Sequence, residues 1–94
     1  MGEEQMPMDF SEALRHCKNG YAIQRQGWNG KDLWVRHVGT RPGGEGKVCL
    51  PYLEMGYPSD HPLYGGCLVP WLASQTDILA EDWIIVNDWE KQNK

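Results

Sequence analysis

The apolar residues of this chain come in short runs separated by glycine and proline, and this spacing restricts the fold more than any other feature. The chain has 94 residues, of which 11 are glycine and 6 are proline. Short apolar runs bounded by such residues are typical of β-strands, and short connections between successive strands favour antiparallel neighbours. The runs are residues 21–26, 33–38, 48–55, 67–71 and 83–86. They predict a small antiparallel sheet of four to five strands.

Two further segments have helical rather than strand-like character. Residues 8–20, MDFSEALRHCKNG, carry apolar residues at helical intervals, a capping residue at Asp9 or Ser11, and a stop signal at Asn19-Gly20. Residues 74–82 can form a second helix of about two turns. We therefore predict an α+β fold, in which an N-terminal helix packs on the sheet and a short helix comes late in the chain.

The connections between these elements are rich in turn-forming residues. Asn29-Gly30 is a strong turn signal and predicts that the first two strands form a hairpin. Residues 39–47 and 56–66 contain several glycines and prolines and predict loops. Pro51 predicts an edge or a bulge in the third strand, and residues 87–94 predict a fraying tail in which Trp89 can dock.

Length and charge narrow the class of protein. A chain this short is expected to form one domain, 1–94, with its core in 8–87. The net charge is −4, and nine basic residues are scattered among thirteen acidic ones, which argues against binding to DNA or RNA polymers. A small anionic ligand remains compatible, since it needs only an arginine or two and some backbone N–H groups. No run approaches the ~18 apolar residues of a membrane span, so a cytoplasmic protein without membrane contact is expected.

The sequence lacks the spacings that usually mark catalytic, metal or cofactor sites. The three cysteines form no C-x-x-C pair, the three histidines are far apart, and no phosphate-binding glycine motif or nucleophile elbow is present. These residues are Cys17, Cys49, Cys67, His16, His37 and His61. We therefore predict no metal, no cofactor and no catalytic residue, and favour binding or assembly over catalysis.

A polar block between two apolar runs is the most informative part of the chain. Ser74-Gln75-Thr76-Asp77 separates the runs that contain Trp71 and Trp83. Ser74 with Asp77 three residues later fits a capping box, which explains two of the four residues. It leaves Gln75 and Thr76 unexplained and places backbone N–H groups where an anion can bind. Capping alone, and capping combined with ligand contacts, both remain open.

Two strings in this chain resemble a known family. GWNGK at residues 27–31 and WLASQTDILAEDW at residues 71–83, in this order and with LPYLEM at residues 50–55 between them, are similar to a small phage and prophage domain. That domain is associated with the second type of Thoeris anti-defense protein. The resemblance spans most of residues 8–87.

The resemblance implies a function that composition alone does not supply. Thoeris is a bacterial anti-phage system, in which a TIR-domain protein makes a cyclic ADP-ribose isomer from NAD and this messenger activates an effector. Proteins of the resembled family act as sponges: they bind the messenger tightly, do not cleave it, and form tetramers built from dimers, with the ligand between protomers. The expected location is the cytoplasm of the infected bacterial host.

The same resemblance directs attention to particular residues. Adenine needs a flat apolar partner, for which Trp28 is the candidate, unless its ring folds back on the core. Phosphates need arginine or free N–H groups, and Arg25 and Arg36 on the hairpin are the candidates, unless they are solvated or paired with Asp32. The complete expected binding set is Arg25, Trp28, Asn29, Arg36, Trp71, Ser74, Gln75, Thr76 and Asp77.

The size of the domain bears on where a ligand can bind, and its loops bear on which ligand it is. A pocket of ~300–1,000 Å³ is hard to enclose within so small a domain, which favours a site between protomers of a homo-oligomer. The loops 39–47 and 56–66 look longer than the family's connections, so a cyclic dinucleotide of a CBASS-type system is an alternative ligand, instead of the ADP-ribose isomer or in addition to it. Two other possibilities are a structural phage protein that docks on another protein through its tryptophans, and a nucleotide-processing enzyme whose site the sequence does not reveal.

Overall fold

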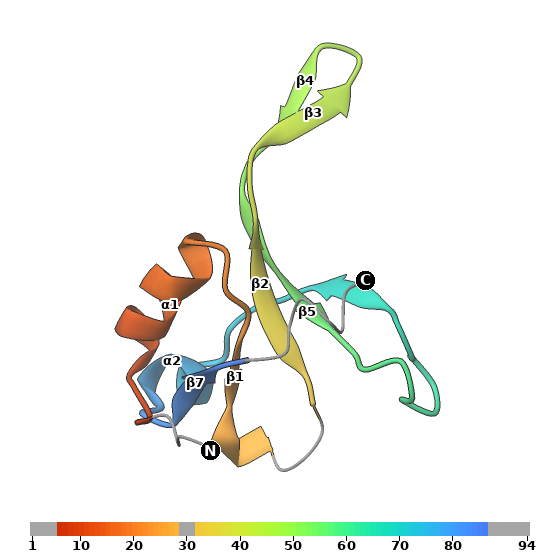
Figure 1. Ribbon diagram of the computed structural model, residues 1–94. Coiled ribbons are helices and arrows are strands. Elements are labelled where there is room, and N and C mark those ends of the chain that lie inside the picture. The colour runs from red at the N-terminus through yellow and green to blue at the C-terminus, as the bar shows by residue number, and fades with distance from the viewer. Residues whose placement is uncertain (1–5, 29–31, 87–94) are drawn as a thin grey trace.

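A computed structural model describes residues 6–28 and 32–86 of the chain. The fold is of the α+β class: a helix comes first, strands follow, and a short helix precedes the last strand (Figure 1). They are α1 (Phe10–Lys18), β1 (Ile23–Arg25), the 3₁₀ turn η1 (Gln26–Trp28), β2 (Trp34–Val38), β3 (Arg41–Gly44), β4 (Lys47–Cys49), β5 (Tyr52–Gly56), β6 (Leu68–Pro70), α2 (Gln75–Leu79) and β7 (Trp83–Ile85). The predicted fold class is confirmed.

Five of the strands form one antiparallel sheet with the order β6-β5-β2-β1-β7. The predicted pairing of the first two strands is confirmed by Ile23 opposite Val35, while the Asn29-Gly30 turn between them lies outside the described residues. β7 adds to the free edge of β1, with Trp83 opposite Arg25. The chain therefore brings residues 25 and 83 together on neighbouring strands.

The N-terminal helix is capped by Asp9, the first of the two capping residues predicted from the sequence. The Asp9 side chain accepts a hydrogen bond from the Glu12 backbone N–H at 2.9 Å, so Asp9 rather than Ser11 is the N-cap. The helix buries Ala13 and Cys17 against the sheet, because these residues lie one turn apart on the same face.

The core lies between α1 and one face of the sheet. Its fully buried members come from α1, from three adjacent strands and from no long loop: Ala13, Cys17, Ile23, Val35 and Trp83. Partly buried aromatic side chains continue this core toward α2. Trp34 and Trp83 are both buried and therefore serve as packing residues.

One predicted loop is wrong. Residues 39–47 do not form an open loop, because β3 and β4 pair as a separate two-stranded sheet that extends away from the body (Figure 1). Gly44, Glu45 and Gly46 all have positive φ, at 86°, 55° and 74°, and so turn the chain within three residues. The apolar alternation that reveals a strand is absent from β3, which reads Arg-Pro-Gly-Gly. We call residues 41–49 the arm.

The third predicted strand, 48–55, is divided in two. Its first residues belong to β4 in the arm, and its last belong to β5 in the main sheet. Leu50-Pro51 separates the two strands, since proline has no N–H to donate to a ladder. The predicted loop after β5 is confirmed for residues 57–66. The tail, including Trp89, lies outside the described residues.

Candidate functional site

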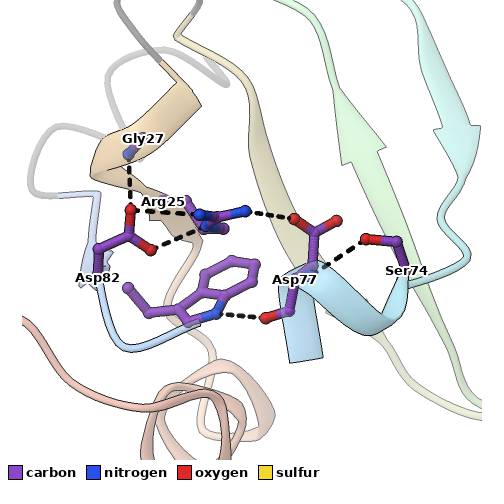
Figure 2. A network of polar contacts seen from close by, with 6 residues as sticks. Arg25, Gly27, Ser74, Asp77 and Asp82 are labelled. Carbon is purple, nitrogen blue, oxygen red and sulfur yellow. Dashed lines mark hydrogen bonds and ion pairs between the residues drawn. The ribbon is translucent and has the colours of Figure 1, made fainter. Parts of the chain in front are cut away.

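A guanidinium on β1 is held by two carboxylates, one from α2 and one from the residue before β7 (Figure 2). Arg25 donates from Nη1 to Asp77 Oδ1 at 2.8 Å and from Nε to Asp82 Oδ1 at 2.8 Å. Its Nη2 lies 3.5 Å from Asp82 Oδ2, which makes the contact with Asp82 two-pronged. The side chains come from positions 52 and 57 residues apart in the sequence. This network therefore fixes α2 against β1.

Asp82 also holds the turn that follows β1. Its Oδ2 accepts the Gly27 backbone N–H at 2.8 Å, and its carbonyl oxygen accepts the Gln26 N–H at 2.9 Å. A Cβ at position 27 would lie 2.8 Å from Asp82 Oδ2, so only glycine allows this close approach without a shift. The hydrogen bond from Arg25 is the main cause that lowers the pKa of Asp82, and Asp82 and then Asp77 raise the pKa of Arg25.

Three tryptophan rings contact one another next to this network, and one of them, Trp83, is hydrogen-bonded to Asp77. The Trp28 ring lies edge-on to Trp83, with a centroid distance of 5.4 Å, and to Trp71 at 6.5 Å. Trp71 lies 6.0 Å from Trp83 in the same edge-on manner, and Phe10 of α1 closes the cluster at 5.2 Å from Trp83. Such geometries are favourable because the positive edge of one ring meets the negative face of another. Trp28 therefore folds back on the core, which was one of its two predicted alternatives. Its side chain nevertheless stays partly exposed.

The polar block has two structural residues and two exposed ones. Ser74 Oγ accepts the Asp77 backbone N–H at 3.1 Å, which confirms Ser74 as the cap of α2. The Asp77 carboxylate, however, turns to Arg25 (Figure 2), and its carbonyl oxygen accepts the Trp83 indole N–H at 2.9 Å. Gln75 and Thr76 are exposed. Both side chains are therefore available to a ligand.

The structure brings most, but not all, of the predicted binding residues together. Arg25, Trp28, Trp71 and the block 74–77 lie on or beside this network, which we call the tryptophan–α2 face. Asn29 lies outside the described residues.

Arg36 lies elsewhere. It neighbours the buried Val35 and so points to the opposite side of the sheet. There its Nε donates to Glu54 Oε1 at 2.8 Å, and its guanidinium lies 5.8 Å from the centre of the Trp34 ring. Pairing with Asp32 was one of the alternatives for these two arginines, but Asp77 and Asp82 accept from Arg25, and Glu54 accepts from Arg36.

Asp82 is the residue that the sequence reasoning missed. The sequence predicts one helix over residues 74–82, which would include Asp82, but α2 ends at Leu79 and Asp82 stands just before β7. The available signal was the position of Asp82, a carboxylate directly before the apolar run 83–86. That run forms a strand which pairs with the strand that carries Arg25. The contact between Gly27 and Asp82 depends on the register between β1 and β7, which the sequence does not show.

Two cavities lie away from this face. One, of about 380 Å³, is lined by Asp32, Trp34, Tyr57, Pro58, Ser59, Asp60, Gly66 and Leu68. Another, of about 320 Å³, is lined by Gly20, Arg36, His37, Val38 and Gly39. Within residues 6–28 and 32–86, no three His, Cys, Asp or Glu side chains are grouped to hold a metal ion. Across the same residues, no helix is long and apolar enough to cross a membrane.

Comparison with known proteins gives the family. The family model of the Thoeris anti-defense 2-like domain matches residues 8–86. A protein of Bacillus phage SP01, named Thoeris anti-defense 2, is 33% identical over 89 residues, a match that covers 85% of this chain and 96% of that protein. The match to the family model includes the whole tryptophan–α2 face. The chain therefore belongs to the Thoeris anti-defense 2-like family of phage anti-defense proteins.

Proposed function

We propose that this protein is a sponge: it binds a cyclic ADP-ribose isomer made by Thoeris TIR proteins, does not degrade it, and so prevents activation of the effector. The observation that carries the proposal is the tryptophan–α2 face, where partly exposed indoles lie beside exposed polar side chains in a member of an anti-defense family. Sequestration requires affinity alone, so the site needs no nucleophile or general base.

The chemistry of the face suits the parts of such a messenger. The exposed portions of Trp28 and Trp71 offer a flat surface on which an adenine can stack, an interaction worth about 1–3 kcal/mol per base. Gln75 and Thr76 offer donors and acceptors to ribose hydroxyls. Arg25 retains N–H groups besides those bonded to the two aspartates, since a guanidinium has five.

The proposal includes a homo-oligomer, a dimer of dimers, that acts in the cytoplasm of the infected cell. Apolar side chains next to the tryptophan–α2 face are open to solvent: Leu72 is 92% exposed and Leu79 is 76% exposed, with Ile78 beside them. Exposed apolar groups of this size beside a polar patch are typical of protein interfaces. A second protomer that covers them would also enclose a ligand held on the face.

A capture-and-release experiment tests the proposal. The protein is incubated with messenger made by a TIR enzyme, passed through a size-exclusion filter and heat-denatured, and the released material is identified by mass spectrometry. Intact messenger in the denatured fraction supports the sponge, and a degraded product would show an enzyme instead. Messenger that passes straight through the filter would refute the proposal in favour of docking on another protein. Parallel incubation with a cyclic dinucleotide tests the CBASS-type alternative.

A further inference from the structure

The tryptophan–α2 face lacks a free cation for a doubly charged ligand. Arg25 is the one cation among the described residues bonded into the face, and two carboxylates already hold it. Glu81 adds a further exposed negative charge beside Asp82. A pyrophosphate brought to this face meets more carboxylates than guanidinium groups. Charge-assisted hydrogen bonds to phosphate are about twice as strong as neutral ones, so cations from another part of the assembly would strengthen binding most.

The arm carries two cations far from the face of its own chain. Arg41 donates one hydrogen bond to the Tyr52 hydroxyl at 3.0 Å, which leaves other N–H groups of its guanidinium for a ligand. Arg41 and Lys47 are exposed, and they outnumber the single carboxylate of the arm, Glu45. Figure 1 shows the arm extending from one end of β2 and β5, while η1 and α2 lie toward the other end. The molecule is correspondingly elongated, with a longest dimension of 48 Å. The cations of one arm therefore cannot serve the face of the same chain.

The arm is also incomplete as a structure on its own. Its two strands pair only with each other in a separate sheet, and an isolated hairpin is marginally stable in water. Val48 is 62% exposed and Leu50 at its base is 74% exposed, so its apolar side chains are unburied. Leu72 and Leu79 beside the face are likewise apolar and exposed, so the two surfaces could cover each other's apolar side chains. The net charge of the arm is positive and that of the face is negative.

We propose that the arm of a second copy of this chain lies across the tryptophan–α2 face of the first, and that Arg41 and Lys47 of that copy bind the messenger's phosphates. This inference rests on the proposed function. The arrangement is reciprocal, because a two-fold axis that places one arm on one face places the other arm on the other face. Each site is thus completed in trans, with base and ribose contacts from one protomer and phosphate contacts from its partner.

Complementation between two inactive variants tests this directly. The arm variant is Arg41→Ala with Lys47→Ala, and the face variant is Gln75→Ala with Thr76→Ala. The control for lost charge is Arg15→Ala with Lys18→Ala, which removes two exposed cations from α1. Each test variant should bind messenger at least about tenfold more weakly than wild type, as expected for lost hydrogen bonds to charged or buried polar groups. The α1 control should bind as wild type does.

The two test variants are then co-expressed with different affinity tags, and doubly tagged oligomers are isolated. Binding in trans predicts that one of the two sites in each mixed pair of protomers regains wild-type affinity, because it combines the intact face of the arm variant with the intact arm of the face variant. No recovery of binding, or no doubly tagged species, would overturn the inference. Wild-type affinity in the arm variant would overturn it too, while leaving the sponge proposal intact. Failure of the wild-type protein to capture messenger would instead refute the proposed function.

Discussion

Replacement of Asp77 and replacement of its neighbour Thr76 should have opposite kinds of effect. The Asp77 carboxylate accepts a hydrogen bond from Arg25 at 2.8 Å, whereas the Thr76 side chain is exposed. We expect Asp77→Ala to destabilise the fold because it frees α2 from β1. We expect Thr76→Ala to leave the fold intact and to weaken messenger binding, if Thr76 contacts the ligand as proposed.

The size of the destabilisation follows from the burial of the pair. Hydrogen bonds to charged groups contribute about 1.5–3 kcal/mol, and fully exposed ion pairs about 0.2–1 kcal/mol. The side chains of Arg25 and Asp77 are 19% and 16% exposed, which places the pair between these limits. Arg25 keeps Asp82 as a partner after the change, so no charge is left alone. Asp77→Ala should therefore lower the free energy of unfolding by about 1–2 kcal/mol, or Tm by roughly 4–16 °C.

Urea and thermal denaturation followed by circular dichroism measure both variants against wild type. Thr76→Ala should stay within about 0.5 kcal/mol of wild type, since the change is exposed and alanine has the higher helix propensity. Asp77→Asn, which keeps the volume but loses the charge, should fall between wild type and Asp77→Ala. Equal denaturation midpoints for wild type and Asp77→Ala would refute the argument that this ion pair anchors α2.

Three other predictions test separate parts of the structure. Gly56→Ala would place a Cβ 2.5 Å from Cη2 of the tryptophan of β2 and closer still to Cε2 and Cζ2, so overpacking should cost about 1–3 kcal/mol in a denaturation experiment. Gly39→Ala is the control, because its added Cβ would have no heavy atom within 4 Å; it should change the free energy of unfolding by less than about 0.5 kcal/mol. An equal loss of stability in Gly56→Ala and Gly39→Ala would contradict the overpacking argument. Burial raises the pKa of the Cys17 thiol to about 11, so iodoacetamide at about pH 8 should label the exposed Cys67 first and Cys17 only after unfolding, as mass spectrometry can establish. Because its folded-state pKa is lowered, Asp82 stabilises the fold above its ordinary pKa of about 4, and this contribution is lost as pH falls through the lower folded value. Asp82→Asn should therefore be less stable at neutral pH and show a shallower decline in acid, and an unchanged acid profile would exclude this role.

Local signals predicted the elements whose stability is local. The Asp9 cap, the apolar face of α1, the Ser74 cap and the short apolar run that forms β2 each depend on residues within a few positions of one another. The arm was missed because proline and glycine hide strand character, and its pairing depends instead on three consecutive positive φ angles at its tip. The conformational permissiveness of glycine, which suggested a loop, is what makes this tight turn possible.

The site could be predicted only in part, because its central contacts are long-range. Arg25 was expected to find a phosphate or a neighbour on its own hairpin, but its partners stand 52 and 57 residues away. Only the addition of β7 to the edge of β1 brings Asp82 beside it. No local pattern reports such a pairing. Conversely, the tryptophans that meet in the cluster were visible in the sequence as individuals, and only the fold shows that they form one surface.

The string that identifies the family is largely a structural motif. In WLASQTDILAEDW, Ser74 caps α2, Asp77 and Asp82 hold Arg25, and Trp83 fills the core. Changes at these positions should weaken ligand binding indirectly, through the fold, so lost binding in such variants does not identify a ligand contact. The side chains of the block that are free of structural duties are Gln75 and Thr76, together with the exposed portion of Trp71. Discrimination between one cyclic nucleotide and another should therefore depend on these few side chains and on whatever the opposing arm contributes, since they can change without cost to the network beneath them.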